Sequence, residues 1–284
     1  MRRLDWTTRL SLSALGVLAL GALIVPELAP TDPRTIGDVL ERRLVPPLGY
    51  DTTGGWHLLG TDKFGRDIFV RMMLAARLSL LVGIAGSLLA GGVGIALGAL
   101  AAWSGGATDR LTMALADALL AIPRLVLLLV CAALWNPGTT TVVAVLVFTG
   151  WMGVARLVRA DVLGARAAPY VEAAVALGAP GRRVLWRHVL PNALGSAVVA
   201  ITLGVGSAIL LESGLSFLGL GVQPPQPSWG NMIADGRDLI VIAPWVALAP
   251  GLAIIGTVLC CTLLGDAIRD VLSGERPVTI GERA

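Results

Sequence analysis

The sequence predicts an all-α polytopic membrane protein with six transmembrane helices. Hydrophobic residues make up 55% of the 284 residues and charged residues only 14%, whereas a soluble domain carries about 25% charged residues. Six separate apolar segments approach the roughly 20 residues that a helix needs to cross a bilayer. An ordinary water-soluble domain is excluded, because such a chain would expose too much apolar surface.

The six predicted spans follow one another along the chain. The first follows the start MRR, the second has no charged residue, the third contains Asp117 and Arg124, and the fourth is short and follows the turn NPG. In order, they cover residues 10–28, 78–102, 111–135, 139–155, 193–218 and 245–264. The first segment also resembles a signal peptide, but its apolar run is long and no small-x-small cleavage pattern follows it. We therefore expect it to be a span.

The placement of arginine predicts which ends of the spans face the cytoplasm. With both termini cytoplasmic, most arginines lie inside, and the loop of residues 219–244 faces outward with Arg237 as its one arginine. The basic residues of segment 29–77 would lie outside, but long loops carry little weight in this rule. We predict three parts: 1–77 (cytoplasmic tail, first span, extracytoplasmic segment), 78–273 (a five-helix core with a cytoplasmic loop at 161–193) and 274–284 (cytoplasmic tail).

The second span carries a small residue at every fourth position. Such a ladder makes one face of a helix nearly flat and lets another helix approach closely. Its members are Gly86, Ala90, Gly94, Gly98 and Ala102. We expect this face to be a packing surface.

A basic, helix-prone stretch between the fourth and fifth spans reads YVEAAVALGAPGRRVLWRHVLPNAL, residues 170–194. Gly178 suits a helix C-cap, because glycine tolerates the left-handed conformation. Pro180 can open a second helix, which we expect to stop before Pro191. The pattern predicts helix, sharp turn, helix. Composition alone supports two interpretations equally: an element that inserts its small alanine face into a partner, or an ordinary positive-inside loop.

The spacing within this stretch resembles the EAA loop of ABC-importer permeases. The family pattern is Glu-Ala-Ala, three residues, Gly, nine residues, an aliphatic or similar residue, one residue, then Leu-Pro. The matching residues are Glu172, Ala173, Ala174, Gly178, Leu190 and Pro191, with His188 at the usual aliphatic position and Asn192 completing HVLPN. HLLGTDKFGRDIFVRMMLAARLSL (57–80), ESGLSFLGLGVQPPQPSWGNMI (212–233) and APWVALAPGLAI (243–254) resemble the C-type subunit of dipeptide, oligopeptide and nickel importers.

The resemblance extends over roughly residues 5 to 273 and implies the type I ABC-importer permease fold. It also implies that the EAA loop is a coupling helix seated in a groove of a cytoplasmic ATPase subunit. The expected partners are a second homologous permease subunit, two ATPase subunits, an extracytoplasmic substrate-binding protein and membrane lipid. The expected location is the bacterial cytoplasmic (inner) membrane. Peptides are the expected substrates, with nickel or another small solute as the alternative.

The chain is not expected to hydrolyse ATP itself. A P-loop requires G-x-x-x-x-G-K-[ST], and the one lysine, Lys63, lies in TDKFG. We therefore expect ATP and Mg on partner subunits, no cofactor on this chain and no catalytic residue. The three cysteines match no metal or disulfide pattern, and the two histidines lie far apart, so no metal site is expected. The absence of a basic block argues against nucleic acid as a partner.

Three ionisable residues inside the predicted spans are candidates for a role in the pathway or in gating. Asp117 and Arg124 are seven residues apart, about two helical turns, and are predicted to share one face at roughly 10 Å. Pro123 would loosen the helix between them, and the segment resembles an aspartate-to-proline stretch of the family. Glu212 lies in the outer half of the fifth span and either bonds within the bundle or faces the pathway.

Two other classes of protein fit less well. A proton-coupled secondary transporter would also use Asp117 and Glu212, but it needs no coupling loop, and the inverted repeats of many such folds are not visible. An intramembrane enzyme would need paired carboxylates or a nucleophile with its base, and neither His188 nor a cysteine has an evident partner.

Overall fold

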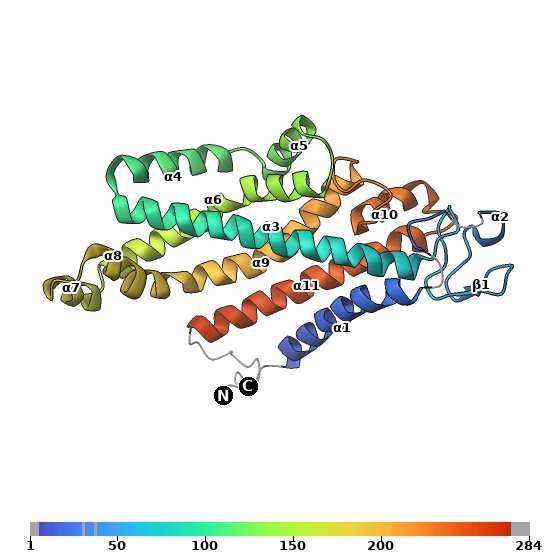
Figure 1. Ribbon diagram of the computed structural model, residues 1–284, viewed down its shortest axis with the longest axis horizontal. Helices are drawn as coiled ribbons and strands as arrows, with labels where there is room; N and C mark the ends of the chain where they lie inside the picture. The colour runs from blue at the N-terminus through green and yellow to red at the C-terminus, as the bar shows by residue number, and fades with distance from the viewer. Residues whose placement is uncertain (1–5, 30–31, 37–38, 274–284) are drawn as a thin grey trace, which may run out of the picture.

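The computed structural model describes residues 6–29, 32–36 and 39–273 and is an elongated bundle of helices (Figure 1). Five long helices run along the bundle: α1 (Trp6–Leu28), α3 (Ile68–Ser104), α6 (Thr139–Arg166), α9 (Leu190–Phe217) and α11 (Trp245–Ser273). Two shorter helices, α4 (Gly106–Leu120) and α5 (Arg124–Leu134), lie against α6. Among the described residues, five helical runs are long and apolar enough to cross a membrane, or six if α4 and α5 form one bent span.

The remaining elements are short. They are the helices α2 (Val39–Arg42), α7 (Pro169–Ala176), α8 (Gly181–Val184) and α10 (Trp229–Gly236), the π turn η1 (Leu185–Val189), the 3₁₀ turn η2 (Arg237–Leu239), and the antiparallel strands β1 (Gly49–Tyr50) and β2 (Trp56–His57).

Several predicted span boundaries differ from those of the helices. Helix α3 begins at Ile68 rather than at residue 78, because the Asp67 side chain accepts a hydrogen bond from the Val70 amide at 2.9 Å and caps the helix there. Helix α6 continues past residue 155 to Arg166. Span-forming helices therefore extend well beyond their most apolar segments.

The predicted third span is not one helix. Helix α4 ends at Leu120, α5 begins at Arg124, and the two axes differ by 92°. Pro123 has φ −52° and ψ 122°; it lacks an N–H, and its ring disfavours a helical residue before it. The prediction that Asp117 and Arg124 share one helical face is wrong, because the helix breaks between them.

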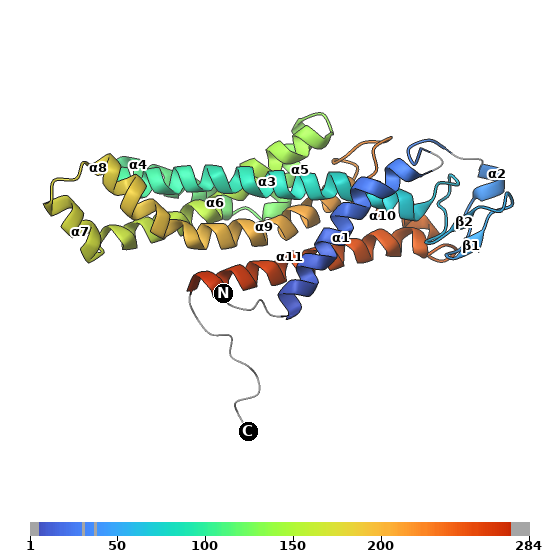
Figure 2. The ribbon, with the colours of Figure 1, turned by 60° about the horizontal axis from the view of Figure 1, so that its bottom comes forward.

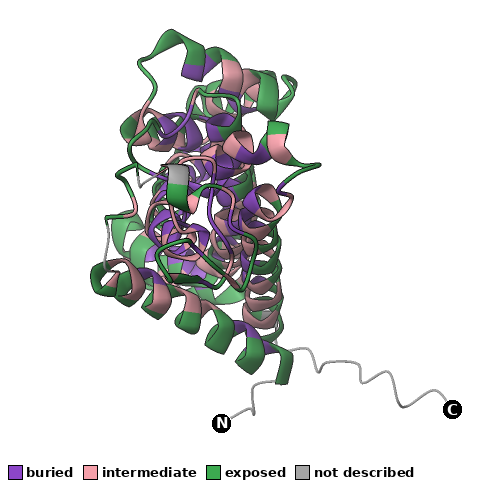
Figure 3. Ribbon diagram, turned by 90° about the vertical axis from the view of Figure 1, so that its right-hand side faces the viewer, coloured by how far each residue is buried: buried purple, intermediate pink, exposed green. Residues whose placement is uncertain are grey.

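The core of the bundle is the contact of α3 with α6, supplemented by α9. The predicted small-residue ladder lies in this contact, as expected: side chains added at Gly94 and Gly98 would collide with the α6 backbone at Trp151 and Ala155. Viewed along the bundle, the buried residues gather between the helices while the outward faces are exposed (Figure 3).

The two ends of the bundle differ in structure. Helices α7 and α8 and the π turn project at one end, while α2, β1 and β2 lie at the other (Figures 1 and 2). The N-terminal end of α1 and the C-terminal end of α11 both point toward the α7 end (Figure 1). We call these the insert end and the hairpin end.

Candidate functional site

The insert, residues 167–189, contains a sharply defined turn after α7. Gly178 has φ +81°, a conformation that glycine adopts without the steric cost borne by other residues. Its amide donates to the Val175 carbonyl at 2.9 Å, and the Ala179 amide donates to the Ala174 carbonyl at 3.1 Å. This pair of bonds is a Schellman motif, so the predicted glycine cap is confirmed.

The second half of the insert does not stop before Pro191, as predicted. Helix α8 passes through the π turn into α9, and residues 181–217 form one continuous helical run. The Leu190 amide donates to the Leu185 carbonyl, which is the i→i+5 bond of a π turn. Pro191, which has no N–H to donate, directly follows this π turn, at the start of α9.

The insert is fixed to the bundle by apolar and polar contacts. Val171, Val184 and Val189 are buried in one cluster with residues of α3, α6 and α9. Close by, the Arg166 guanidinium donates to the Ala102 carbonyl at 2.6 Å and lies 5.0 Å from the centre of the Trp103 ring. A force applied to the insert is therefore transmitted directly to three long helices.

The outer face of the insert exposes large apolar side chains. Leu177 is 88% exposed, Trp186 66% and Val175 58%, and they lie at the projecting end of the bundle (Figure 2). Large apolar side chains exposed on a projecting segment form a candidate site of protein interaction. Beside it, Trp186 and three arginines line an open groove; the arginines are Arg182, Arg183 and Arg187.

The residues predicted from the EAA spacing fall into two sets. Glu172, Ala173, Gly178, Pro191 and Asn192 are exposed, Ala174 and His188 are partly buried, and Leu190 is buried. Of the exposed residues, Pro191 lines the groove beside Trp186. Leu190 belongs instead to the buried cluster that attaches the insert, and the Asn192 amide donates to the His188 carbonyl at 2.7 Å.

Two ion pairs join α4 to α6. Arg156 lies 3.3 Å from Asp117, and both side chains are more than half exposed; Arg159 donates to Asp109 with one bond of 2.6 Å. Asp117 thus pairs with α6 and not with Arg124. The sequence analysis counted Arg156 and Arg159 only among the arginines expected on the cytoplasmic side. Two acids on α4 and two arginines on α6 are a signal for antiparallel pairing that it did not use.

Arg124 lies apart from these pairs. Its guanidinium nitrogen Nη2 lies 3.3 Å from the position that a Cβ at Gly150 would take, and it lines a cavity of about 280 Å³ bounded by α3, α6 and α9. Asp117 and Arg124 therefore lie on different helices, α4 and α5, and their side chains contact different residues of α6.

Glu212 lies inside the bundle, fully buried. Its carboxylate accepts hydrogen bonds from the Ser79 hydroxyl at 3.0 Å and the Ser216 hydroxyl at 2.7 Å. Ser216 in turn accepts from the Val222 amide at 3.1 Å. Glu212 thereby links α3, α9 and the segment that follows α9. Of the two placements considered from sequence, the structure shows bonding within the bundle.

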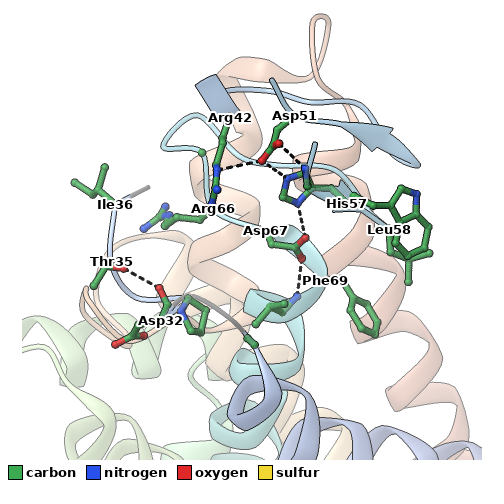
Figure 4. A pocket seen from close by; sticks show the side chains of 16 residues that line it. Asp32, Thr35, Ile36, Arg42, Asp51, His57, Leu58, Arg66, Asp67 and Phe69 are labelled. Carbon is green, nitrogen blue, oxygen red and sulfur yellow. Dashed lines mark hydrogen bonds and ion pairs between the residues drawn. The ribbon is translucent and has the colours of Figure 1, made fainter. Parts of the chain in front are cut away.

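A further polar cluster lies at the hairpin end, around a cavity of about 650 Å³ (Figure 4). The His57 ring joins Asp67 at 2.7 Å and Asp51 at 3.3 Å. The Thr53 hydroxyl and the Gly55 amide donate to Asp51, and Arg42 lies 3.0 Å away. These interactions lower the pKa of Asp51 to about 2 against the opposing effect of burial. Asp51 therefore remains ionised at neutral pH and holds the hairpin to α2.

This end is also tied to α10 and α11. Lys63 lies 3.2 Å from Asp235 and Arg66 lies 3.6 Å from it, and the Trp245 indole donates to the Thr61 carbonyl at 3.3 Å. Segment 39–67 is thus a folded cap on the bundle. Within the described ranges, no group of three or more His, Cys, Asp or Glu side chains is arranged to hold a metal ion.

Comparison with known proteins gives the family from sequence and the fold from a solved structure. Residues 94–275 match the family described as "Binding-protein-dependent transport system inner membrane component". The permease OppC of an oligopeptide transport system from Bacillus subtilis (strain 168) is 40% identical over 216 residues, 76% of this chain and 71% of the relative. The permease DppC of a di/tripeptide transport system from Pseudomonas aeruginosa (strain UCBPP-PA14) is 41% identical over 252 residues, 88% and 82% of the two chains.

A third relative, the glutathione transport system permease protein GsiD of Pectobacterium atrosepticum, is 42% identical over 76% of this chain and 72% of its own length. Among solved structures, a chain of the MetNI methionine ABC transporter in an inward-facing conformation superposes with a TM-score of 0.59. It is 17% identical and the match covers 71% of this chain and 96% of that one. This similarity confirms the all-α permease fold.

The family consists of transport subunits in the membrane rather than enzymes, and its ATPase is a separate subunit. The multi-helix bundle agrees with the permease fold that the family resemblance implied. The chain belongs to the family of binding-protein-dependent transport system inner membrane components, the permease subunits of ABC importers.

Proposed function

We propose that this chain forms half of the translocation pathway of an ATP-driven importer of peptides in the bacterial cytoplasmic (inner) membrane. The observation that carries the proposal is the set of exposed apolar side chains on the insert, which offers a docking surface for a partner subunit. A buried apolar cluster attaches the insert to the bundle, so movement of a docked partner reaches the long helices. The relatives are named as permeases for oligopeptides, for di- and tripeptides and for glutathione. These names support peptides as the substrate class.

The proposed assembly contains a second, homologous permease subunit, two ATPase subunits and an extracytoplasmic substrate-binding protein. The insert end and both termini face the cytoplasm, and the hairpin end faces the binding protein. ATP and Mg bind to the ATPase subunits, and this chain binds neither of them. Lipid surrounds the remaining apolar surface.

The proposed mechanism is alternating access. Closure of the ATPase pair on ATP moves the insert, and α6 and α9 follow because they continue directly into it. Nucleotide can shift the bundle between inward and outward states only if its affinity differs between them. In the proposed assembly the insert is the part of this chain that contacts the nucleotide-binding subunits. Closure of those subunits on ATP therefore favours one state of the bundle by moving the insert.

The substrate class is tested by uptake in cells that carry the complete transporter. We expect deletion of this chain to abolish uptake of labelled trialanine and the wild-type chain to restore it, while nickel uptake stays unchanged. Binding of trialanine and of Ni²⁺ to the purified substrate-binding protein provides the matched control. Nickel uptake that depends on this chain, with trialanine uptake unaffected, would favour the metal-importing alternative and contradict peptide import.

A further inference from the structure

Arg124 places a positive charge halfway along the bundle. It is the first residue of α5, directly after the 92° bend, and its guanidinium rests against Gly150 of α6. Gly150 lies 150 − 139 = 11 residues after the start of α6 and 166 − 150 = 16 residues before its end. These separations correspond to about 17 Å and 24 Å of helix, so the charge lies near mid-depth if α6 crosses the membrane.

The cavity beside Arg124 is walled by small residues. Gly86 and Gly91 of α3, Gly150 and Gly153 of α6 and Gly204 of α9 leave a space of about 280 Å³. Among the described residues that line it, Arg124 is the only charged one. The Ser87 hydroxyl is already bonded to the Ile201 carbonyl at 2.6 Å. The Ser207 hydroxyl also lines the cavity, so the described lining residues offer a ligand one charged group, the Arg124 guanidinium, and one neutral hydroxyl.

Arg124 differs from the neighbouring arginines in the contacts of its side chain. Arg156 and Arg159 are each paired with an aspartate of α4, but no hydrogen bond or ion pair joins the Arg124 side chain to any residue within 6–29, 32–36 and 39–273. A cation at the centre of a bilayer costs about 2.5–3.5 kcal/mol even on insertion scales, and such residues face a bundle interior or a water-filled cavity. Arg124 must therefore face water or an anion.

The surroundings of Arg124 continue as a polar path. Toward the insert end, the next exposed residue on this side of α6 after Gly153 is Arg156, paired with Asp117, and both of these side chains are more than half exposed. Contact with lipid tails is costly for an ion pair that is more than half exposed, so this face favours a watery surrounding. The α4–α6 side of the bundle is thus suited to line an aqueous passage, with Arg124 at its midpoint.

We propose that Arg124 and its glycine-walled cavity hold the terminal carboxylate of a peptide during its passage. This inference rests on the proposed import of peptides and adds the chemical group that this chain recognises. The planar guanidinium of arginine matches a carboxylate with two parallel hydrogen bonds. The terminal carboxylate is present in every unmodified peptide, so one arginine serves substrates whose side chains differ. The small walls accommodate whichever side chain lies next to that carboxylate.

The first test measures the electrostatic field in the cavity without using transport. Gly153→Cys introduces a thiol into open space, because nothing lies within 4 Å of the added Cβ. In the assembled transporter, the rate of modification of this thiol is measured with an anionic and with a cationic methanethiosulfonate. The rate for the chain that has only its native cysteines is subtracted. Arg124→Gln should lower the anionic-to-cationic rate ratio by about tenfold, as expected for removal of a unit charge at short range.

Arg110→Gln is the matched control, because Arg110 is an exposed arginine of α4 that bonds only to a carbonyl of its own helix within the described chain. This variant should leave the ratio unchanged. An equal ratio in Arg124→Gln and wild type overturns the assignment. It is also overturned if neither reagent reaches the thiol introduced by Gly153→Cys.

The second test compares import of trialanine with import of trialanine amide in proteoliposomes containing the whole transporter and its binding protein. We expect Arg124→Gln to slow import of trialanine by about tenfold or more and import of trialanine amide by less than about threefold. Arg124→Lys should import trialanine at a rate between those of Arg124→Gln and the wild type. Equal slowing of both peptides overturns the inference. If the wild-type transporter imports neither peptide, the proposal of peptide import is wrong and the carboxylate assignment is wrong with it. If the wild type imports trialanine but Arg124→Gln leaves the ratio of labelling rates unchanged, only the Arg124 assignment is overturned.

Discussion

Replacing Gly178 with valine is expected to remove most ATP-driven uptake while the chain still inserts into the membrane. A residue with a Cβ in the left-handed conformation costs about 1–2 kcal/mol, and the φ of +81° at Gly178 requires that conformation. Loss of this conformation would break the two hydrogen bonds that close the turn, and the angle between α7 and α8 would change. The measurement is trialanine uptake by cells, with the amount of inserted protein determined by immunoblotting of membranes.

Gly164→Val is the control for this substitution. Gly164 is an exposed glycine of α6 with open space at its Cβ position and without a positive φ. Because a free-energy change of 1–2 kcal/mol corresponds to a factor of about 5–30, Gly178→Val should reduce uptake by about tenfold, and Gly164→Val should reduce it by less than about twofold. Equal uptake in the two variants would show that the shape of the turn has no part in coupling.

Glu212→Ala is expected to destabilise the bundle more than any exposed substitution. It removes the acceptor of two buried hydroxyls, on Ser79 and Ser216, and a buried polar group without a partner costs about 1–3 kcal/mol. It also leaves a cavity where a fully buried side chain was. We expect the thermal unfolding midpoint of the purified chain in detergent to fall by about 5 °C or more. Glu212→Gln keeps the shape of the side chain and one acceptor oxygen, so its unfolding midpoint should lie between those of Glu212→Ala and the wild type.

Glu27→Ala provides the comparison, since Glu27 is also a span glutamate, paired with Arg77 at 2.9 Å, but its side chain is 71% exposed. Exposed ion pairs contribute about 0–1 kcal/mol, so this midpoint should move little. A fall no larger for Glu212→Ala than for Glu27→Ala would contradict the interpretation of Glu212 as a buried link between α3 and α9.

Local rules of sequence predicted the parts of the structure that depend on one residue type. The cap at Gly178 follows from the conformational freedom of glycine, and the flat face of α3 at Gly94 and Gly98 follows from the absence of side chains. The same rules failed for the two prolines. Pro123 breaks the third span completely rather than loosening it, and Pro191 is accommodated by a π turn that sequence spacing does not reveal.

The charged contacts were not predictable from sequence, because they depend on which helices become neighbours. Asp117 was expected near Arg124 but pairs with Arg156 on the next long helix. The partner of Glu212, Ser79, is 133 residues away in the chain. Sequence identified Asp117, Arg124 and Glu212 as candidates by their charge within an apolar segment, but only the fold shows that Asp117 and Glu212 have side-chain partners.

The central claim, that the insert is the docking surface for an ATPase subunit, is tested most directly by co-purification. The chain is expressed with its partner subunits, and the ATPase retained with it is measured for wild type, Leu177→Glu and Val241→Glu. Leu177 and Val241 are similarly exposed apolar residues, 88% and 91%, one in the insert and the other in the turn between η2 and α11. We predict that Leu177→Glu loses most of the ATPase and that Val241→Glu retains it at the wild-type level. Full retention by Leu177→Glu, or equal loss by both variants, would contradict the claim.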